Sequence, residues 1–375
     1  MKLYILLLTL TAALTAAPGA SELNSEGLKL YYQAHYAEAE SHYRQAREAA
    51  ETPRDRGSIE INLGTVLRTE GRYAEGEPVL AEALHTLETA AGPDDAGTGL
   101  AASALAALYQ AWGQPIKAEP LAARAERIFA AHLAPDSPER VNNSRVRASI
   151  YMDEKRYAAA EEILRDLVRG AETREAVGAY NDLAMCALAQ RQLSKAESLA
   201  EQAQAIASRL LPVGHPVRAD ILNNLAQIYR FEGKYAEAEA RYREAIDLWR
   251  KAFGPRNPDA AKGMLNLAAL YHERGREAGA EDLYRGAAVI FQAAYGENHP
   301  LTLVARDELA EVLRAEGRFS ESERLSRAVL PALEHALDRK DPRVVRALAN
   351  YARLLEDTKR PREAAAVRVR IEGLL

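Results

Sequence analysis

A five-residue phrase returns nine times along the chain, and it constrains the fold more than any other feature. Clear copies read GRYAE at residues 71–75 and GKYAE at residues 233–237. The third residue of the nine copies falls at positions 36, 73, 115, 157, 193, 235, 277, 319 and 361, so most neighbouring copies are 42 residues apart. A fixed period of this length is typical of arrays that repeat one supersecondary unit.

The segments on both sides of each phrase have the apolar spacing of amphipathic helices. Leu222, Leu225 and Ala226 precede one copy, and Ala238 and Tyr242 follow it, at separations of three to four residues. The small alanines allow two helix backbones to approach each other. Glycine within the phrase suits the left-handed conformation that ends a helix. Each phrase is therefore predicted to be the turn of an antiparallel helical hairpin.

Prolines mark the boundaries between these hairpins. Four of them share the 42-residue period, namely Pro216, Pro258, Pro300 and Pro342. Proline is favoured at the first helical position, where its missing N–H has no helical partner. Ser137, Asn257 and Asp341 stand before such prolines and are good N-cap types. The sequence predicts an all-α solenoid of about nine antiparallel hairpins over residues 21–375, with a short irregular unit around residues 158–193.

The first twenty residues differ from all that follow. Lys2 precedes an apolar run to Leu14, and small residues follow at positions 16–20. This is the layout of a secretory signal peptide, which we predict for residues 1–20. It implies an exported protein, periplasmic or extracellular, whose mature chain has no membrane span. An uncleaved anchor or a buried first helix is the alternative.

Composition and motifs argue against several classes of function. The formal net charge of −5 provides no basic face for nucleic acid. We find no metalloprotease His-Glu-x-x-His, no phosphate-binding glycine loop and no nucleophile elbow. The single cysteine, Cys186, lies in an apolar helical stretch and is expected to be buried. Because the hairpins use every residue from about position 22, we predict no enzyme activity, no cofactor and no metal site.

The repeat resembles a known family. Asn224, Leu225 and Ala226, followed by Tyr229 and the phrase at residues 233–237, resemble the tetratricopeptide repeat. The 42-residue period is similar to the longer repeats of the kinesin light chain. The resemblance covers about residues 22–375 and implies a right-handed superhelix. It also implies a concave groove, lined by the first helix of each hairpin, that binds a protein or peptide.

The resemblance and the helix pattern together place a set of polar side chains in this groove. They are Asn62, Arg145, Asn181, Asn223, Asn224, Gln227, Arg230, Lys262, Asn266, Arg346 and Asn350. An amide offers two donors and an acceptor, which suits the backbone of an extended peptide. The alternative is that these asparagines bond neighbouring turns and only hold the superhelix together.

The charges expected in the groove have mixed signs. The family's carboxylate clamp of Lys, Asn and Arg is not reproduced in consecutive units. Asp307, Glu308 and Glu311 cluster toward the C-terminus. They are either important for a ligand or, as we favour from the sequence, a solvated face.

Two departures from regularity remain. The spacing of 36 residues between Tyr157 and Leu193 shortens one unit, which predicts either a bend in the array or simple repeat drift. The last helix, about residues 362–374, carries apolar residues such as Val367 and Ile371. This helix either mediates self-association through that end or is kept soluble by Arg368, Arg370 and Glu372.

The sequence therefore predicts a non-enzymatic interaction scaffold of the cell envelope or secreted space that binds a protein or peptide partner. Two alternatives stay open. One is a structural array that associates with itself, and the other is an accessory subunit that positions an envelope enzyme.

Overall fold

A computed structural model describes residues 19–33, 35–169 and 173–374 of the chain. Within these residues the chain folds into 18 α-helices and no strand, so the predicted all-α solenoid of helical hairpins is confirmed. Residues 1–18, which hold most of the predicted signal peptide, lie outside the described residues. The same is true of residues 170–172 in the short unit.

The helices pair into nine hairpins, counted over the described residues. In chain order they are α1 (Ala20–Tyr32) with α2 (Tyr36–Glu48), α3 (Pro53–Thr69) with α4 (Tyr73–Ala91), α5 (Ala96–Ala111) with α6 (Pro115–His132), α7 (Pro138–Asp153) with α8 (Tyr157–Val168), α9 (Arg174–Ala189) with α10 (Leu193–Leu210), α11 (Pro216–Phe231) with α12 (Tyr235–Phe253), α13 (Pro258–Glu273) with α14 (Glu277–Tyr295), α15 (Pro300–Ala315) with α16 (Phe319–Ala336), and α17 (Pro342–Asp357) with α18 (Pro361–Glu372). Each second helix begins at the third residue of a phrase.

The helix boundaries follow from local chemistry. The side chains of Ser137, Asn257 and Asp341 accept hydrogen bonds from backbone N–H groups in the first helical turn, and a proline follows each of them. Inside the hairpins, Gly71 and Gly233 adopt left-handed φ angles of 70° and 77°. Glycine takes this conformation at no steric cost, so the chain can reverse within a few residues.

The core follows the predicted alternation of small and large residues. Ala226 and Ala238 are completely buried, and Tyr242 fills the space beside them. Burying one large apolar side chain contributes roughly 1.5–3 kcal/mol. Cys186 is buried as a small core residue, as predicted.

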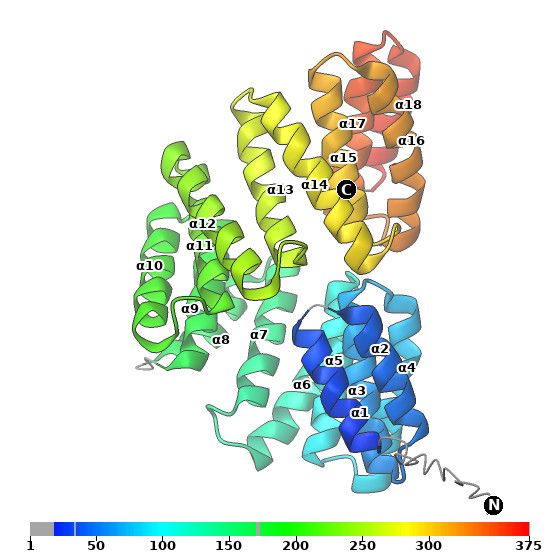
Figure 1. The fold of residues 1–375 in the computed structure, drawn as a ribbon, viewed down its shortest axis with the longest axis vertical. Helices are drawn as coiled ribbons and strands as arrows, with labels where there is room; N and C mark the ends of the chain where they lie inside the picture. Colours follow the sequence, from blue (N-terminus) through cyan, green and yellow to red (C-terminus); the bar gives the residue numbers. More distant parts are fainter. Residues whose placement is uncertain (1–18, 34, 170–172, 375) are drawn as a thin grey trace, which may run out of the picture.

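The hairpins stack into a superhelix that returns on itself. Successive first helices contact one another along most of the array, whereas second helices contact mainly their neighbours in sequence. The first helices therefore line the inner, concave side. Figure 1 shows the C-terminal hairpins from α15 to α18 above the N-terminal hairpins from α1 to α5. The short unit contains α8, of 12 residues, where α6 has 18.

Candidate interaction surfaces: the inner groove and the seam

Asparagine side chains join successive first helices along the inner groove. Asn62 donates to Asn24 on the preceding first helix at 2.9 Å. Asn224 donates to Asn181 at 3.1 Å and Asn266 donates to Asn223 at 3.0 Å, each across 43 residues of chain. Asn223 also donates to its neighbour Asn224 at 3.3 Å. We call this row of bonds between first helices the amide ladder.

Charged pairs continue the same connection between first helices. Arg145 bonds Asp182 through Nε at 2.5 Å, and Arg230 bonds Glu273 through Nε at 2.7 Å. Arg346 pairs with Glu308 at 3.1 Å. Asn350 donates to Asp307 at 2.7 Å, again across 43 residues, and this bond is counted as part of the amide ladder. The predicted groove arginines are therefore all engaged by carboxylates of a neighbouring first helix.

The acidic cluster near the C-terminus differs from its prediction. Asp307 is only 4% exposed and Glu311 only 5%, so the predicted solvated face is wrong. The next first helix, α17, covers them with Asn350 and with Arg353, which pairs with Glu311 at 3.2 Å. Burial, together with the charge of Glu308, raises the pKa of Asp307 to about 7.

The remaining predicted groove residues lie near one stretch of the wall. Gln227 is half-buried on α11, and Lys262 on α13 pairs with Asp259 at 2.9 Å. Asp220 is open to the groove, but the surrounding protein removes enough water to raise the pKa of its carboxyl to about 6, and Asp259 adds to this rise. This stretch of the wall is polar and carries both signs of charge.

A second surface arises where the superhelix returns on itself, and we call it the seam. The turn edge of the N-terminal hairpins meets the loop edge of the C-terminal hairpins. A Cβ atom placed on Gly71 would lie 2.4 Å from Cδ2 of His299, and one on Gly113 would lie 3.8 Å from Asp341. The two residues of each pair are separated by the same number of positions along the chain. The two edges therefore meet in a regular register.

Aromatic rings meet across the seam. Tyr36 stacks on Tyr295 with ring centroids 5.8 Å apart, and Tyr295 lies against His299 at 4.3 Å. His299 also caps α15 by accepting from the backbone N–H of Leu301 at 3.0 Å. Burial lowers the pKa of His299 to about 3 despite a hydrogen bond with the Thr69 backbone, and nearby Lys262 and Arg343 add to the lowering. His299 is therefore neutral at pH 7.

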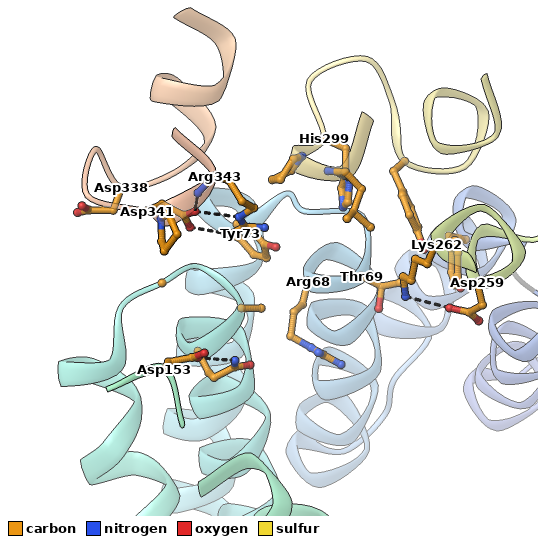
Figure 2. A pocket seen from close by; sticks show the side chains of 18 of the residues that line it. Arg68, Thr69, Tyr73, Asp153, Asp259, Lys262, His299, Asp338, Asp341 and Arg343 are labelled. Atoms are coloured by element: carbon orange, nitrogen blue, oxygen red, sulfur yellow. Dashed lines mark hydrogen bonds and ion pairs between the residues drawn. The ribbon is translucent and has the colours of Figure 1, made fainter. Parts of the chain in front are cut away.

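The two edges of the seam line a half-open cavity of about 920 Å³, which we call the seam cavity. Figure 2 shows labelled residues from both edges around this cavity, with Arg68, Thr69 and Tyr73 from the N-terminal hairpins and His299 and Lys262 from the C-terminal hairpins. Tyrosines from both edges form part of the wall, namely Tyr31, Tyr32, Tyr36, Tyr73 and Tyr295. Sequence reasoning missed this surface because no local pattern brings the two edges together.

The basic residue of the recurring phrase also has a role that the sequence prediction missed. Arg276 bonds Glu239 of the preceding second helix at 2.8 Å, and Arg318 bonds Glu281 at 2.9 Å, each across 37 residues. Equivalent bonds link Arg156 to Glu119, Lys234 to Glu197, and Arg360 to Glu323. The sequence signal is a glutamate four residues after the start of most second helices. These pairs join hairpins on the outer side and leave the inner groove unaffected.

The C-terminal helix is more covered than its sequence suggested. Val367, Ile371 and Leu374 pack against the cluster around Leu333 and Leu348, while Val369 remains 67% exposed. Arg368 pairs with Glu356 of α17 at 2.5 Å. Self-association through this end stays a prediction.

No helix in the described part of the chain has the length and apolar character needed to cross a bilayer. The described residues also contain no group of three or more His, Cys, Asp or Glu side chains placed to hold a metal ion.

Sequence comparison identifies the family. The profile of the tetratricopeptide repeat matches residues 55–131, 175–251, 217–285 and 259–335, which together take in more than half of the chain. The chain belongs to the tetratricopeptide repeat family, whose members bind protein partners. A comparison with curated proteins found no match.

Several solved structures are similar to this chain. A Rap protein in complex with Competence and Sporulation Factor aligns over 85% of this chain and 97% of its own, with 14% identity and a TM-score of 0.53. TPR-like repeats of a candidate kinesin light chain from Podosopora anserina align over 54% of this chain and 98% of their own, with 23% identity and a TM-score of 0.44. BtubC (BKLC) from P. vanneervenii aligns over 59% and 88%, with 19% identity and a TM-score of 0.49. The Rap likeness supports the fold alone.

Proposed function

We propose that this protein is a non-enzymatic scaffold that binds an extended segment of a partner protein in its inner groove. The observation that carries the proposal is the amide ladder. It uses one N–H of Asn62, Asn224 and Asn266, and a primary amide has two. These side chains are half-buried, so they are held in place and still face the groove.

The ladder also defines how binding would work. Amides fixed by their neighbours lose little side-chain freedom when a ligand arrives, which lowers the entropic cost of binding. A peptide backbone offers alternating donors and acceptors that such amides can meet without regard to its side chains. Nearby Asp220 and the Lys262–Asp259 pair supply charges that select among segments.

Site-specific photo-crosslinking tests the groove. A photoreactive amino acid replaces Gln227, which lies in the groove without belonging to the amide ladder. The matched control places it at Gln202 on the exposed outer side of α10. We expect a discrete crosslinked partner from position 227 alone, and mass spectrometry of the crosslinked peptide gives the bound segment. Equal crosslinking from both positions, or from position 202 alone, contradicts groove binding.

The proposal includes export, on the strength of the residues 1–20 pattern. Fractionation of cells that make the full chain, beside cells that make residues 21–375, tests this part separately. We expect the full chain outside the cytoplasm and the shorter chain inside it. Cytoplasmic retention of the full chain overturns export but leaves the groove proposal standing.

Analytical sedimentation of the purified protein distinguishes the scaffold hypothesis from the hypothesis of a self-associating array. The scaffold is expected to sediment as a monomer in the absence of a partner. A concentration-dependent oligomer that Val369→Glu dissociates would favour assembly through the C-terminal helix, where Val369 is a large exposed apolar residue.

A further inference from the structure

Arg68 occupies a position that two other hairpins fill with a paired arginine. Arg230 and Arg314 stand at the same place relative to the turn, in the last part of a first helix. Each of them bonds a carboxylate 43 residues further along the chain: Arg230 bonds Glu273, and Arg314 bonds Asp357. The residue 43 positions after Arg68 is Ala111, which cannot accept a hydrogen bond through its side chain.

The Arg68 guanidinium is consequently without a protein partner. No hydrogen bond or ion pair joins it to another residue in the part of the chain that the structure describes, although the side chain is half-buried. Arg68 and Ala111 both line the seam cavity. Figure 2 shows the Arg68 side chain between Asp153 on one side and Thr69 on the other. A partly buried cation that lacks a counter-charge is costly, so an anionic group is favoured there.

The other charged residues that line the cavity are either exposed or already paired. Asp153 is exposed and accepts a hydrogen bond from Gln110 at 2.8 Å, and Asp338 and Lys340 are also exposed. Lys262 pairs with Asp259 at 2.9 Å, and Arg343 pairs with Asp341 at 2.7 Å. His299 is neutral. Arg68 is therefore the half-buried charge, among the described cavity residues, that still requires a partner of opposite sign. A ligand with a single negative charge meets that requirement better than a doubly charged phosphate.

We propose that the seam cavity is a second binding site, for a small carboxylate with an aromatic body, anchored by Arg68. A guanidinium offers parallel donors that match the two oxygens of a carboxylate. Tyr31, Tyr36 and Tyr73 provide aromatic wall beside it. The volume of about 920 Å³ lies within the range of ~300–1,000 Å³ typical of small-ligand sites.

The position of the cavity gives the ligand a further effect. Both edges of the seam line it, so an occupant contacts the N-terminal and the C-terminal hairpins at once. A ligand that binds only the closed seam stabilises it in proportion to its concentration over its Kd. The site goes beyond the groove proposed above, and the two sites are tested by different residues.

Calorimetric titration of the full chain tests the anchor. The probe is N-acetylphenylalanine, and its uncharged amide is the matched ligand control. We expect the acid to bind at least tenfold more tightly than the amide, and Arg68→Gln to weaken the acid by roughly 10–100-fold, as expected for loss of a charge-assisted pair. Arg314→Gln, at the equivalent position outside the cavity, is expected to leave the affinity unchanged.

A second variant keeps the test independent of folding. Ala111→Glu places on the next first helix the carboxylate that Arg230 and Arg314 already have, so the fold is expected to be retained. The new pair occupies Arg68, and binding of the acid is expected to fall at least tenfold while the melting temperature holds or rises. The proposal is overturned if the wild-type chain does not bind the acid, or binds the acid and the amide equally well. It is also overturned if inorganic phosphate competes as well as the acid, or if folded Ala111→Glu binds the acid as tightly as the wild type.

Discussion

The amide ladder and the seam hold the same molecule together in different ways. The ladder joins hairpins that are neighbours in sequence, through bonds that recur at a separation of 43 residues. The seam joins hairpins from opposite ends of the array, through Tyr36 on Tyr295 and Gly71 against His299. Interfaces between neighbours can be gained one at a time in a solenoid. The seam forms only when the intervening units stack correctly, so it reports on the whole array.

The largest expected loss of stability comes from Gly71→Ala, and comparison with Gly233→Ala distinguishes the cost of backbone strain from the cost of the lost seam contact. Gly71→Ala and Gly233→Ala both place a Cβ on a left-handed residue, at a cost of about 1–2 kcal/mol. The new Cβ of the first variant would also lie 2.4 Å from the His299 ring, whereas no atom lies within 4 Å of the second. We expect Gly71→Ala to lose about 1–3 kcal/mol more.

A pair of fluorophores on α4 and α16 measures seam opening in these variants. We expect their separation to increase in Gly71→Ala and to stay at the wild-type value in Gly233→Ala. Similar separations in both variants would mean that the seam tolerates the clash and contributes little to closure.

Within the ladder, Asn350→Ala is expected to have the next largest effect. It leaves the buried Asp307 carboxyl without its amide donor, at a cost of about 1.5–3 kcal/mol. Asn266→Ala removes a half-buried bond to Asn223 and is expected to cost about 0.5–1.5 kcal/mol. Urea unfolding followed by circular dichroism gives both values. Equal losses in the free energy of unfolding would show that the contribution of a ladder bond does not depend on its burial.

Acidification is expected to act on the two regions in opposite directions. The pKa of His299 is about 3 in the closed seam and ~6.5 in an open chain, so the open state binds a proton first and the seam weakens below pH ~6.5. The pKa of Asp307 is about 7 in the folded chain and ~3.9 unfolded, so the folded state holds the proton and the ladder strengthens as pH falls from about 7 to ~4.

Each of these two effects amounts to about 1.4 kcal/mol per pH unit inside its window. The fluorophore distance across the seam and hydrogen exchange in α15 and α17 follow the two regions separately between pH 8 and 5. His299→Asn is expected to flatten the first profile and Asp307→Asn the second. Seam and ladder profiles that move together would contradict the assignment of the two groups.

Periodicity predicted the features that depend on one hairpin and its neighbour. The turn glycines, the proline starts and the buried alanines at positions 226 and 238 all follow from local spacing. The spacing of the asparagines did not show whether they contact a ligand in the groove or bond the neighbouring first helix, because both roles place the amide on the same inner face. Asp307 was misjudged because Asn350, which covers it, lies on the next first helix.

The seam was beyond prediction for a physical reason. Its register is the sum of small rotations between successive units, and a change of a few degrees in each would separate the edges. The unpaired Arg68 became recognisable only once the separation of 43 residues, one more than the sequence period, identified Ala111 as the residue opposite it.

The return of the array on itself also limits how such a gene can change its length. Duplication or loss of one 42-residue unit between residues 73 and 299 would bring a different loop opposite Gly71. In an open array an extra unit is a neutral extension, but here it would break the fit of both edges at once. The closure of the seam therefore constrains the number of units within the turn as well as the residues that meet across it.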